Sequence, residues 1–272
     1  MVAGLRRHAQ LIGATLIPNL KVGVNESLSF GQTLREREKV CRRSRQSEGG
    51  EIWFLKAYLT KDQLMSQPPK HLSQAHPWHG VSAGDESRGI VNAYIEIVPT
   101  DAVKYELDKS SGHLRVDRPQ RFSSMCPTLY GFIPQTFCGQ LVGELCAERT
   151  GRSNIYGDKD PMDICVLTEK AFAHGSFFLL AKPIGGLRMI DAAQADDKII
   201  AVLESDLAYG AIDAVADVPR GLIDRLKHYF LSYKQLPEDA PKKVEIVDVY
   251  DREEALEVIK RSVLDYGTEF GG

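Results

Sequence analysis

Hydrophobic and polar residues alternate along residues 91–118 with the two-residue period of β-strands. The alternation predicts strands over residues 91–97, 103–107 and 114–118, with a hairpin turn at residues 108–112, which are rich in Asp, Ser and Gly. Alternate side chains of a strand point to the same face. The charged positions of these three strands are therefore expected close together, and they are Glu96, Lys104, Glu106 and Arg118.

Further short apolar segments extend this pattern to about residue 203. Residues 130–136 predict a strand that ends in a bend, because Gly and Pro interrupt an aromatic and apolar run. Strands are also expected at residues 164–167 and 199–203, and residues 176–190 predict two strands joined by a Pro-Ile-Gly-Gly turn. Residues 139–157, with several Gly and mixed charges, predict a loop or insertion.

The last part of the chain changes to the 3.6-residue period of helices. One helix is expected to begin at Pro219, with Asp217 as its cap, and to end near Lys234. A second is expected over residues 252–265, with Gly267 as its stop. The order of elements predicts one α+β domain, in which a small closed or nearly closed sheet is flanked by helices.

The first residues differ in character from this domain. The first fifty hold more basic than acidic residues, scattered Ser and little apolar periodicity. Two explanations stay open: an organelle transit peptide within residues 1–64, or translation that begins at Met65. We expect residues 1–75 to be a weakly ordered and dispensable extension, residues 76–267 to be the folded domain, and residues 268–272 to be a C-terminal tail.

Composition excludes several classes of protein. Hydrophobic residues make up 43% of the chain and charged residues 26%, as in ordinary globular proteins. The net charge of −3 lacks the basic excess of nucleic-acid binders, and no apolar run approaches the roughly 20 residues of a membrane span. The five Cys residues contain no Cys-x-x-Cys pair, so we expect reduced thiols and a cytoplasmic location, with organelle import as the alternative.

Two acidic loops are the candidates for chemistry. Three carboxylates fall within six residues immediately before the apolar run at 164–167, and a second acidic segment lies before the run at 199–203. A solvated acidic turn is the simplest explanation for one such loop. Two loops at strand ends, however, offer enough oxygen ligands for hard cations, Mg²⁺ above all. The acids concerned are Asp158, Asp160 and Asp163 in the first loop, and Asp191 and Asp196 in the second.

Other metal and nucleotide sites do not fit these loops. An EF-hand loop that began at Asp158 would have Asp163 at its required Gly position and Met162 at a ligand position. No His-Glu-x-x-His zinc motif, P-loop or Gly-x-Ser-x-Gly elbow is present. Basic residues that could bind phosphate oxygens occur beside the acids, including Lys198 and Lys234. Both sets together point to hydrolysis or transfer at a phosphoanhydride.

Six sequence segments, in the same order, resemble the soluble (family I) inorganic pyrophosphatases. They cover residues 94–266 approximately. The segments are YIEI, KYELD with VDRP, YGFIPQT, GDKDPMD, PIGGLRMID with ADDKIIAV, and HYFLSYK. The resemblance implies an OB-like β-barrel core, hydrolysis of inorganic pyrophosphate to two orthophosphates, and several Mg²⁺ ions per site. We also expect a homo-oligomer that binds neither nucleic acid nor membrane.

The resemblance also implies a role for each matching residue. Asp160 would be the general base. The metal ligands would be Asp158, Asp163, Asp191 and Asp196, with Glu96 and Glu106 completing the shell. The phosphoryl groups would be held by Lys104, Arg118, Tyr130, Lys198, Tyr233 and Lys234.

The sequence departs from the family pattern at two places. Lys159 stands where a small or acidic residue is usual, and it could dampen the local negative potential. Residues 192–195 read Ala-Ala-Gln-Ala, where glutamates and a glycine are common. The sequence leaves two alternatives to an active enzyme open. One is an inactive relative that serves as a scaffold, and the other is an OB-type module that binds single-stranded nucleic acid.

Overall fold

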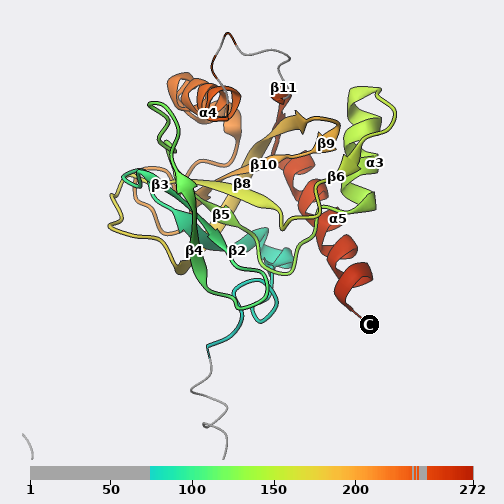
Figure 1. Ribbon diagram of the computed structural model, residues 1–272, viewed down its shortest axis with the longest axis horizontal. Coiled ribbons are helices and arrows are strands. Elements are labelled where there is room, and N and C mark those ends of the chain that lie inside the picture. Colours follow the sequence, from blue (N-terminus) through green and yellow to red (C-terminus); the bar gives the residue numbers. More distant parts are fainter. Residues whose placement is uncertain (1–73, 235, 237, 239–243, 272) are drawn as a thin grey trace, which may run out of the picture. The chain divides into compact units, whose positions relative to one another are not determined.

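Five strands close into a mixed β-barrel in the computed structural model, which describes residues 74–234, 236, 238 and 244–271 (Figure 1). Each strand is hydrogen-bonded to the next, and the last returns to the first; only the β7–β10 pair is parallel. The predicted small closed barrel is therefore confirmed. In order around the barrel, the strands are β2 (Ile90–Ile97), β5 (Leu129–Phe132), β7 (Asp163–Leu167), β10 (Lys198–Leu203) and β8 (Phe177–Asp191).

Strand β8 is one continuous strand, and the predicted turn at residues 183–186 is wrong. Pro-Gly-Gly sequences usually mark turns, but the two glycines here allow another strand to approach closely. A Cβ atom on Gly185 would lie 2.5 Å from the carbonyl oxygen of Tyr250, and one on Gly186 would lie 2.3 Å from the Tyr250 ring. The length of β8 lets it pair with β2, β10 and a further strand, β11 (Val244–Asp251).

The remaining strands are short additions to the barrel. A two-stranded hairpin, β3 (Val103–Leu107) and β4 (Leu114–Pro119), forms a separate sheet, as the alternating pattern predicted. Its residues Lys104, Glu106 and Arg118 border the same cavity as the first residues of β7 and β10. The other short elements are β1 (Gly84–Asp85), η3 (Glu86–Arg88), β6 (Tyr156–Gly157), β9 (Gln194–Ala195) and η4 (Val215–Asp217).

Helix α3 (Gln140–Thr150) occupies a segment predicted as a loop. Its first residues lack a side-chain cap of their own, since the preceding residue is Gly139. Asp265, from α5, supplies the cap: its carboxylate accepts hydrogen bonds from the backbone N–H groups of Gly139, Leu141 and Val142 at 3.0–3.1 Å. The helix signal therefore lies more than a hundred residues away in the sequence, and no local pattern could reveal it.

The two helices predicted from periodicity are present with different ends. Helix α4 (Arg220–Ser232) begins after Pro219, and Asp217 lies in η4 and does not cap it. Helix α5 (Arg252–Phe270) continues past its expected stop at Gly267. Its cap is Asp251, whose side chain accepts a hydrogen bond from the backbone N–H of Glu254.

Both faces of strand β7 are buried. In β7, Ile164 and Val166 belong to a cluster that α3 and α5 share, whereas Cys165 and Leu167 belong to a cluster under α4. Alternate strand residues point to opposite sides, so helices must cover the outside of the barrel. Burying each such side chain contributes about 1.5–3 kcal/mol.

Among the described residues, no helix is long and apolar enough to cross a membrane.

Candidate active site

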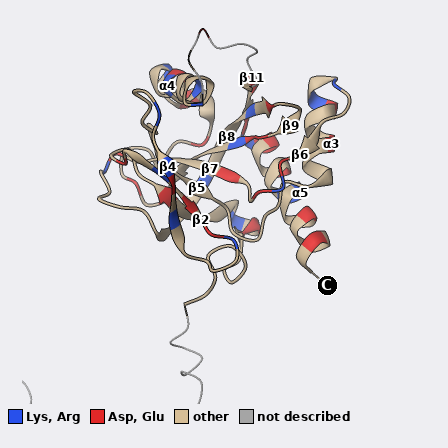
Figure 2. Ribbon diagram, viewed as in Figure 1, with Lys and Arg blue, Asp and Glu red and all other residues tan. Residues whose placement is uncertain are grey.

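One cavity of about 320 Å³ collects every side chain predicted for the site. Acidic and basic segments meet in the middle of the molecule in Figure 2, around β4, β7 and β8. The predicted residues that border the cavity are Glu96, Lys104, Glu106, Arg118, Tyr130, Asp158, Asp160, Asp163, Asp191, Asp196, Lys198, Tyr233 and Lys234.

Strand ends position these side chains. Asp163 is the first residue of β7 and Lys198 the first of β10, and the parallel register pairs these two residues directly. Asp191 is the last residue of β8. Since the barrel brings the ends of these strands together, the two acidic loops, far apart in sequence, border one cavity. Lys234 joins them from just beyond the end of α4.

Lys198 binds the acids of both loops. Its ammonium donates to Asp163 Oδ2 at 2.6 Å and also to Asp196 Oδ1. The lysine is only 1% exposed. Burial by itself lowers the pKa of Lys198, but the adjacent Asp163 and Asp196 carboxylates outweigh burial and hold it well above the usual range. Lys198 is therefore charged and fixed between the loops.

Burial above all, and then the closeness of other carboxylates, opposes ionisation of several acids in the cavity. Burial, followed by the nearby Asp196, raises the pKa of Asp158, and burial likewise raises the pKa of Asp196. Burial raises the pKa of Glu96 to about 8, although this side chain accepts a hydrogen bond from the Leu107 N–H at 2.7 Å. Such a site favours cations among its oxygens.

Two further contacts hold acids at the cavity wall. The Tyr130 hydroxyl donates to Asp163 Oδ2 at 2.6 Å, and the ammonium of Lys234 donates to Asp191 Oδ2 at 2.5 Å. Tyr130 is kept in its neutral, donating form because burial and the charge of Asp163 raise its pKa. Asp163 Oδ2 thus accepts hydrogen bonds from both the Tyr130 hydroxyl and the Lys198 ammonium.

Two hydrogen bonds hold the first acidic loop in place. The Asp160 N–H donates to Asp158 Oδ1 at 3.0 Å, and the N–H of Cys138 donates to the Asp160 carbonyl at 2.8 Å. Lys159, between the two acids, has a φ of +66° and an exposed side chain that does not border the cavity. Its ammonium is therefore not among the cations that line the site.

Several cavity residues were not predicted from the sequence. Lys109 forms an ion pair with Asp160, and Trp78 and Gln194 also border the cavity. Asp117, on β4, pairs with Lys104 at 3.2 Å and with its neighbour Arg118. Lys109 lies in the segment whose sequence predicted a turn and Asp117 in one that predicted a strand, and neither pattern indicated a role in the site.

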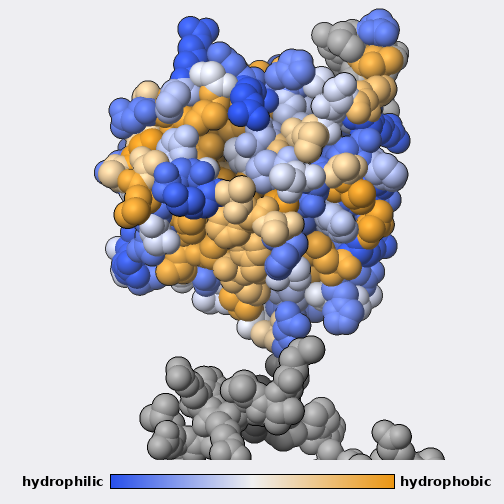
Figure 3. All heavy atoms as spheres, turned by 90° about the vertical axis from the view of Figure 1, so that its left-hand side faces the viewer, coloured by the Kyte–Doolittle hydropathy of each residue, from blue (hydrophilic) through white to orange (hydrophobic). Residues whose placement is uncertain are grey.

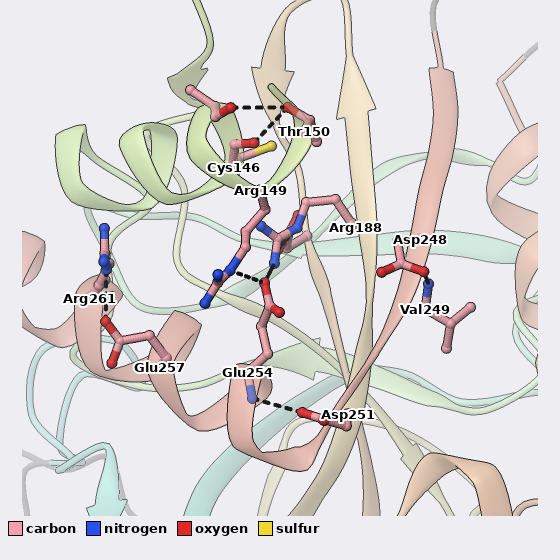
Figure 4. A network of polar contacts seen from close by, with 12 residues as sticks. Cys146, Arg149, Thr150, Arg188, Asp248, Val249, Asp251, Glu254, Glu257 and Arg261 are labelled. Carbon is pink, nitrogen blue, oxygen red and sulfur yellow. Dashed lines mark hydrogen bonds and ion pairs between the residues drawn. The ribbon is translucent and has the colours of Figure 1, made fainter. Parts of the chain in front are cut away.

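An ion network centred on the buried Arg188 joins α3, α5 and β8 (Figure 4). Arg188, on β8, is 2% exposed and pairs with Asp197 Oδ2 at 3.2 Å and with Glu254 Oε1 at 2.6 Å. Arg149 reaches the same Glu254 oxygen from α3 at 3.1 Å, so that two guanidinium groups converge on one carboxylate. Asp197 directly follows Asp196, so this network anchors the backbone of the second acidic loop.

The donor set suits hard divalent cations. Within the described part of the chain, no three His, Cys, Asp or Glu side chains already form a metal-binding group; lysine ammonium groups stand between the carboxylates instead. Seven carboxylates and five Lys or Arg side chains border the cavity. Such an oxygen-rich set is of the type that binds hard divalent cations.

The fold and the site together define a class of protein. A closed barrel that presents acidic strand ends opposite Lys, Arg and Tyr side chains is built for a hydrolase that acts on linked phosphoryl groups.

Comparison with known proteins identifies the family. The inorganic pyrophosphatase family model matches residues 93–267. The inorganic pyrophosphatase of Chlamydia muridarum is 50% identical over 206 residues, which are 74% of this chain and 98% of that protein. A soluble inorganic pyrophosphatase of rice (Oryza sativa subsp. indica) is 35% identical over 211 residues, 78% of this chain and 88% of its own. The crystal structure of inorganic pyrophosphatase from Thermus thermophilus superposes with a TM-score of 0.59 at 28% identity, over 71% of this chain and 99% of that one.

The chain belongs to the family of soluble (family I) inorganic pyrophosphatases, and it is an inorganic diphosphatase. Hydrolysis of inorganic pyrophosphate is its reaction, as the resemblance in the sequence had predicted.

Proposed function

We propose that pyrophosphate is hydrolysed in this cavity with the help of several Mg²⁺ ions. The observation that carries the proposal is the meeting of seven carboxylates and five Lys or Arg side chains on one cavity. Asp158, Asp163, Asp191 and Asp196 would hold the ions, and Glu96 and Glu106 would complete the shell. Bound divalent cations supply charge neutralisation on the phosphoryl oxygens and a lower pKa for water.

Asp160 acts as the general base in this proposal. Its side chain is 48% exposed, so water reaches it, whereas Asp196 at 12% is enclosed. Asp160 takes a proton from the attacking water while the new oxygen–phosphorus bond forms and the bond to the bridging oxygen breaks. The other phosphoryl group leaves as orthophosphate and takes up the proton that Asp160 removed, so that one water is consumed and two orthophosphates form.

The basic and hydroxyl side chains hold the phosphoryl groups. Lys104 and Arg118 are partners in the register of the β3–β4 hairpin, and both contact Asp117. A planar guanidinium binds two phosphoryl oxygens at once, and an ammonium adds a compact charge. The side chains proposed for this role are Lys104, Arg118, Tyr130, Lys198, Tyr233 and Lys234.

Phosphate release from pyrophosphate, with and without added Mg²⁺, tests the proposal. We expect rapid release with Mg²⁺, almost none after chelation, and little release from ATP offered as a competing substrate. Equal release in the presence of a chelator would contradict the role of the carboxylates. Release from ATP at the rate found for pyrophosphate would contradict the proposed substrate.

Self-association and location are part of the same proposal. The face shown in Figure 3 has apolar areas beside hydrophilic ones. The exposed large hydrophobic side chains of the described residues include Val116, Phe122 and Met125. We expect a homo-oligomer, which light scattering after gel filtration will detect.

A cytoplasmic location is expected. Fluorescence microscopy of the tagged full chain tests this location against organelle import.

A further inference from the structure

Lys109 borders the active-site cavity, although no matching family segment assigned it a role. It lies in the turn between β3 and β4. Its ammonium forms an ion pair with Asp160 and lies 5.6 Å from the centre of the Trp78 ring. We propose that Lys109 is a further substrate-binding residue, whose ammonium leaves the Asp160 carboxylate to bind a phosphoryl oxygen of pyrophosphate. This inference rests on the proposed function.

The turn that carries Lys109 is held by its own hydrogen bonds. Asp108 Oδ1 accepts from the Ser111 N–H at 2.8 Å and from the Ser110 hydroxyl at 2.7 Å. The Gly112 N–H donates to the Asp108 carbonyl at 2.8 Å. An Asp at the first position stabilises such a turn. The backbone of Lys109 is therefore fixed, and only its side chain needs to move between partners.

A second segment holds the turn against the cavity. His76 Nε2 lies 3.2 Å from the Lys109 carbonyl, and a Cβ atom on Gly112 would lie 2.8 Å from the His76 ring. The adjacent Trp78 is 3% exposed, and its indole N–H donates to the Thr136 carbonyl at 2.8 Å. The Trp78 ring is thus a fixed wall, whose face attracts the ammonium and keeps it at the cavity.

The other cations of the cavity are more enclosed or more firmly paired. The Lys198 side chain is 2% exposed between two carboxylates, and those of Lys104 and Arg118 are about 25% exposed and share Asp117. Lys234, at 37%, pairs with Asp191, whereas Lys109 is 46% exposed. Exposed ion pairs are weak in water, so a multiply charged phosphate competes well with Asp160 for this ammonium. Among the Lys and Arg side chains that border the cavity, Lys109 is therefore the best placed to meet an arriving anion.

Lys109→Gln and Lys109→Arg, made in the full chain, test the inference. The control is Lys170→Gln, because Lys170 is an exposed lysine that pairs with Glu169 outside the cavity. For each variant we would measure KM and kcat for pyrophosphate at saturating Mg²⁺. Calorimetry would give the Kd of imidodiphosphate, a pyrophosphate whose bridging oxygen is replaced by NH.

We expect Lys109→Gln to raise both KM and Kd about tenfold, which corresponds to about 1.4 kcal/mol. Lys109→Arg keeps the charge and should stay within about threefold of the parent chain, and Lys170→Gln should match it. Unchanged KM and Kd in Lys109→Gln would overturn the inference. So would a loss confined to kcat, because Lys109 would then act only through Asp160.

Two controls distinguish weaker substrate binding from unfolding of a variant and from failure of the proposed function. Thermal melting of each variant shows whether it is folded, and Lys109→Met, which keeps the side-chain length, replaces Lys109→Gln should the latter unfold. Failure of the proposed function itself would appear in the parent chain, as absence of phosphate release from pyrophosphate.

Discussion

Asp163 is the residue at which the contacts of the site meet. One of its oxygens accepts from both the Tyr130 hydroxyl and the Lys198 ammonium at 2.6 Å. Its backbone pairs with Lys198 on one side and with Phe132 on the other. A single carboxylate therefore combines a hydrogen-bonded role in the barrel with the proposed role of metal ligand.

Asp163→Asn should lower turnover at least about 100-fold, because the amide removes the charge while keeping the size of the side chain. We expect its melting temperature to stay within a few degrees of the parent. Phosphate release and thermal melting measure the two effects. Asp224→Asn, on the exposed side of α4, is the control and should keep full activity. A fully active Asp163→Asn enzyme would remove Asp163 from the proposed ligands.

At the scale of elements, the turn between β8 and β9 is strained. Asp191 pairs with Gln194, so Ala192 and Ala193 form the two-residue loop, with φ values of +49° and +73°. Positive φ at both positions favours Asn followed by Gly, whereas an Ala at each of them costs about 1 kcal/mol. The departure of residues 192–195 from the family pattern thus has a structural consequence: the loop beside Asp191 adopts a conformation that its own residues disfavour.

The double variant Ala192→Asn with Ala193→Gly should stabilise the chain by about 1–2 kcal/mol, because both new residues suit the backbone of this turn. A shift of a few degrees in melting temperature is expected for a domain of this size. Ala147→Gly, inside α3, is the matched control and should destabilise by about 0.5–1 kcal/mol. Destabilisation by the turn variant would show that its residues are not strained.

At the scale of the whole molecule, the buried ion network joins elements that the sequence separates. Arg188 on β8 contacts Glu254 on α5 and Asp197 just before β10, and Arg149 adds α3 (Figure 4). Burial raises the pKa of Asp197 to about 6 even with Arg188 beside it. The ionised form of a carboxylate buried in this way is stable only beside its cationic partner.

Arg188→Met should destabilise the chain by about 3–5 kcal/mol, because Asp197 would remain buried without its cation. Adding Asp197→Asn to Arg188→Met should restore part of the loss, since no buried charge is then left alone. Urea unfolding of both single variants and the double variant measures the coupling. Additive effects would mean that the two residues do not stabilise the fold as a pair.

Residues 1–64 lie outside the described residues, so the predicted limits of the extension, domain and tail stay predictions. The Chlamydia muridarum relative is matched over 98% of its length by 206 residues of this chain. We therefore expect removal of residues 1–64 to leave kcat and KM for pyrophosphate within about twofold, since every strand of the barrel lies within residues 90–203. Loss of soluble, active protein on truncation would show instead that the extension contributes to the fold.

Local patterns predicted the parts of the fold that depend on local forces. The alternation at residues 103–118 predicted the β3–β4 hairpin, and the 3.6-residue period predicted α4 and α5 to within a few residues at their starts. The patterns did not predict α3, whose cap is the distant Asp265, or the continuous β8, whose glycines accommodate Tyr250. In both cases the decisive contact is made by a residue remote in the sequence.

The sequence by itself determined most of the side chains proposed for the chemistry, because the ordered motifs name all of the proposed cavity residues except Lys109. Tertiary structure decided which partners those side chains have. It placed Lys198 between Asp163 and Asp196, and it brought Lys109 from a hairpin turn to Asp160. Charge is a property of a residue, whereas pairing of charges depends on how a closed barrel brings its strand ends together.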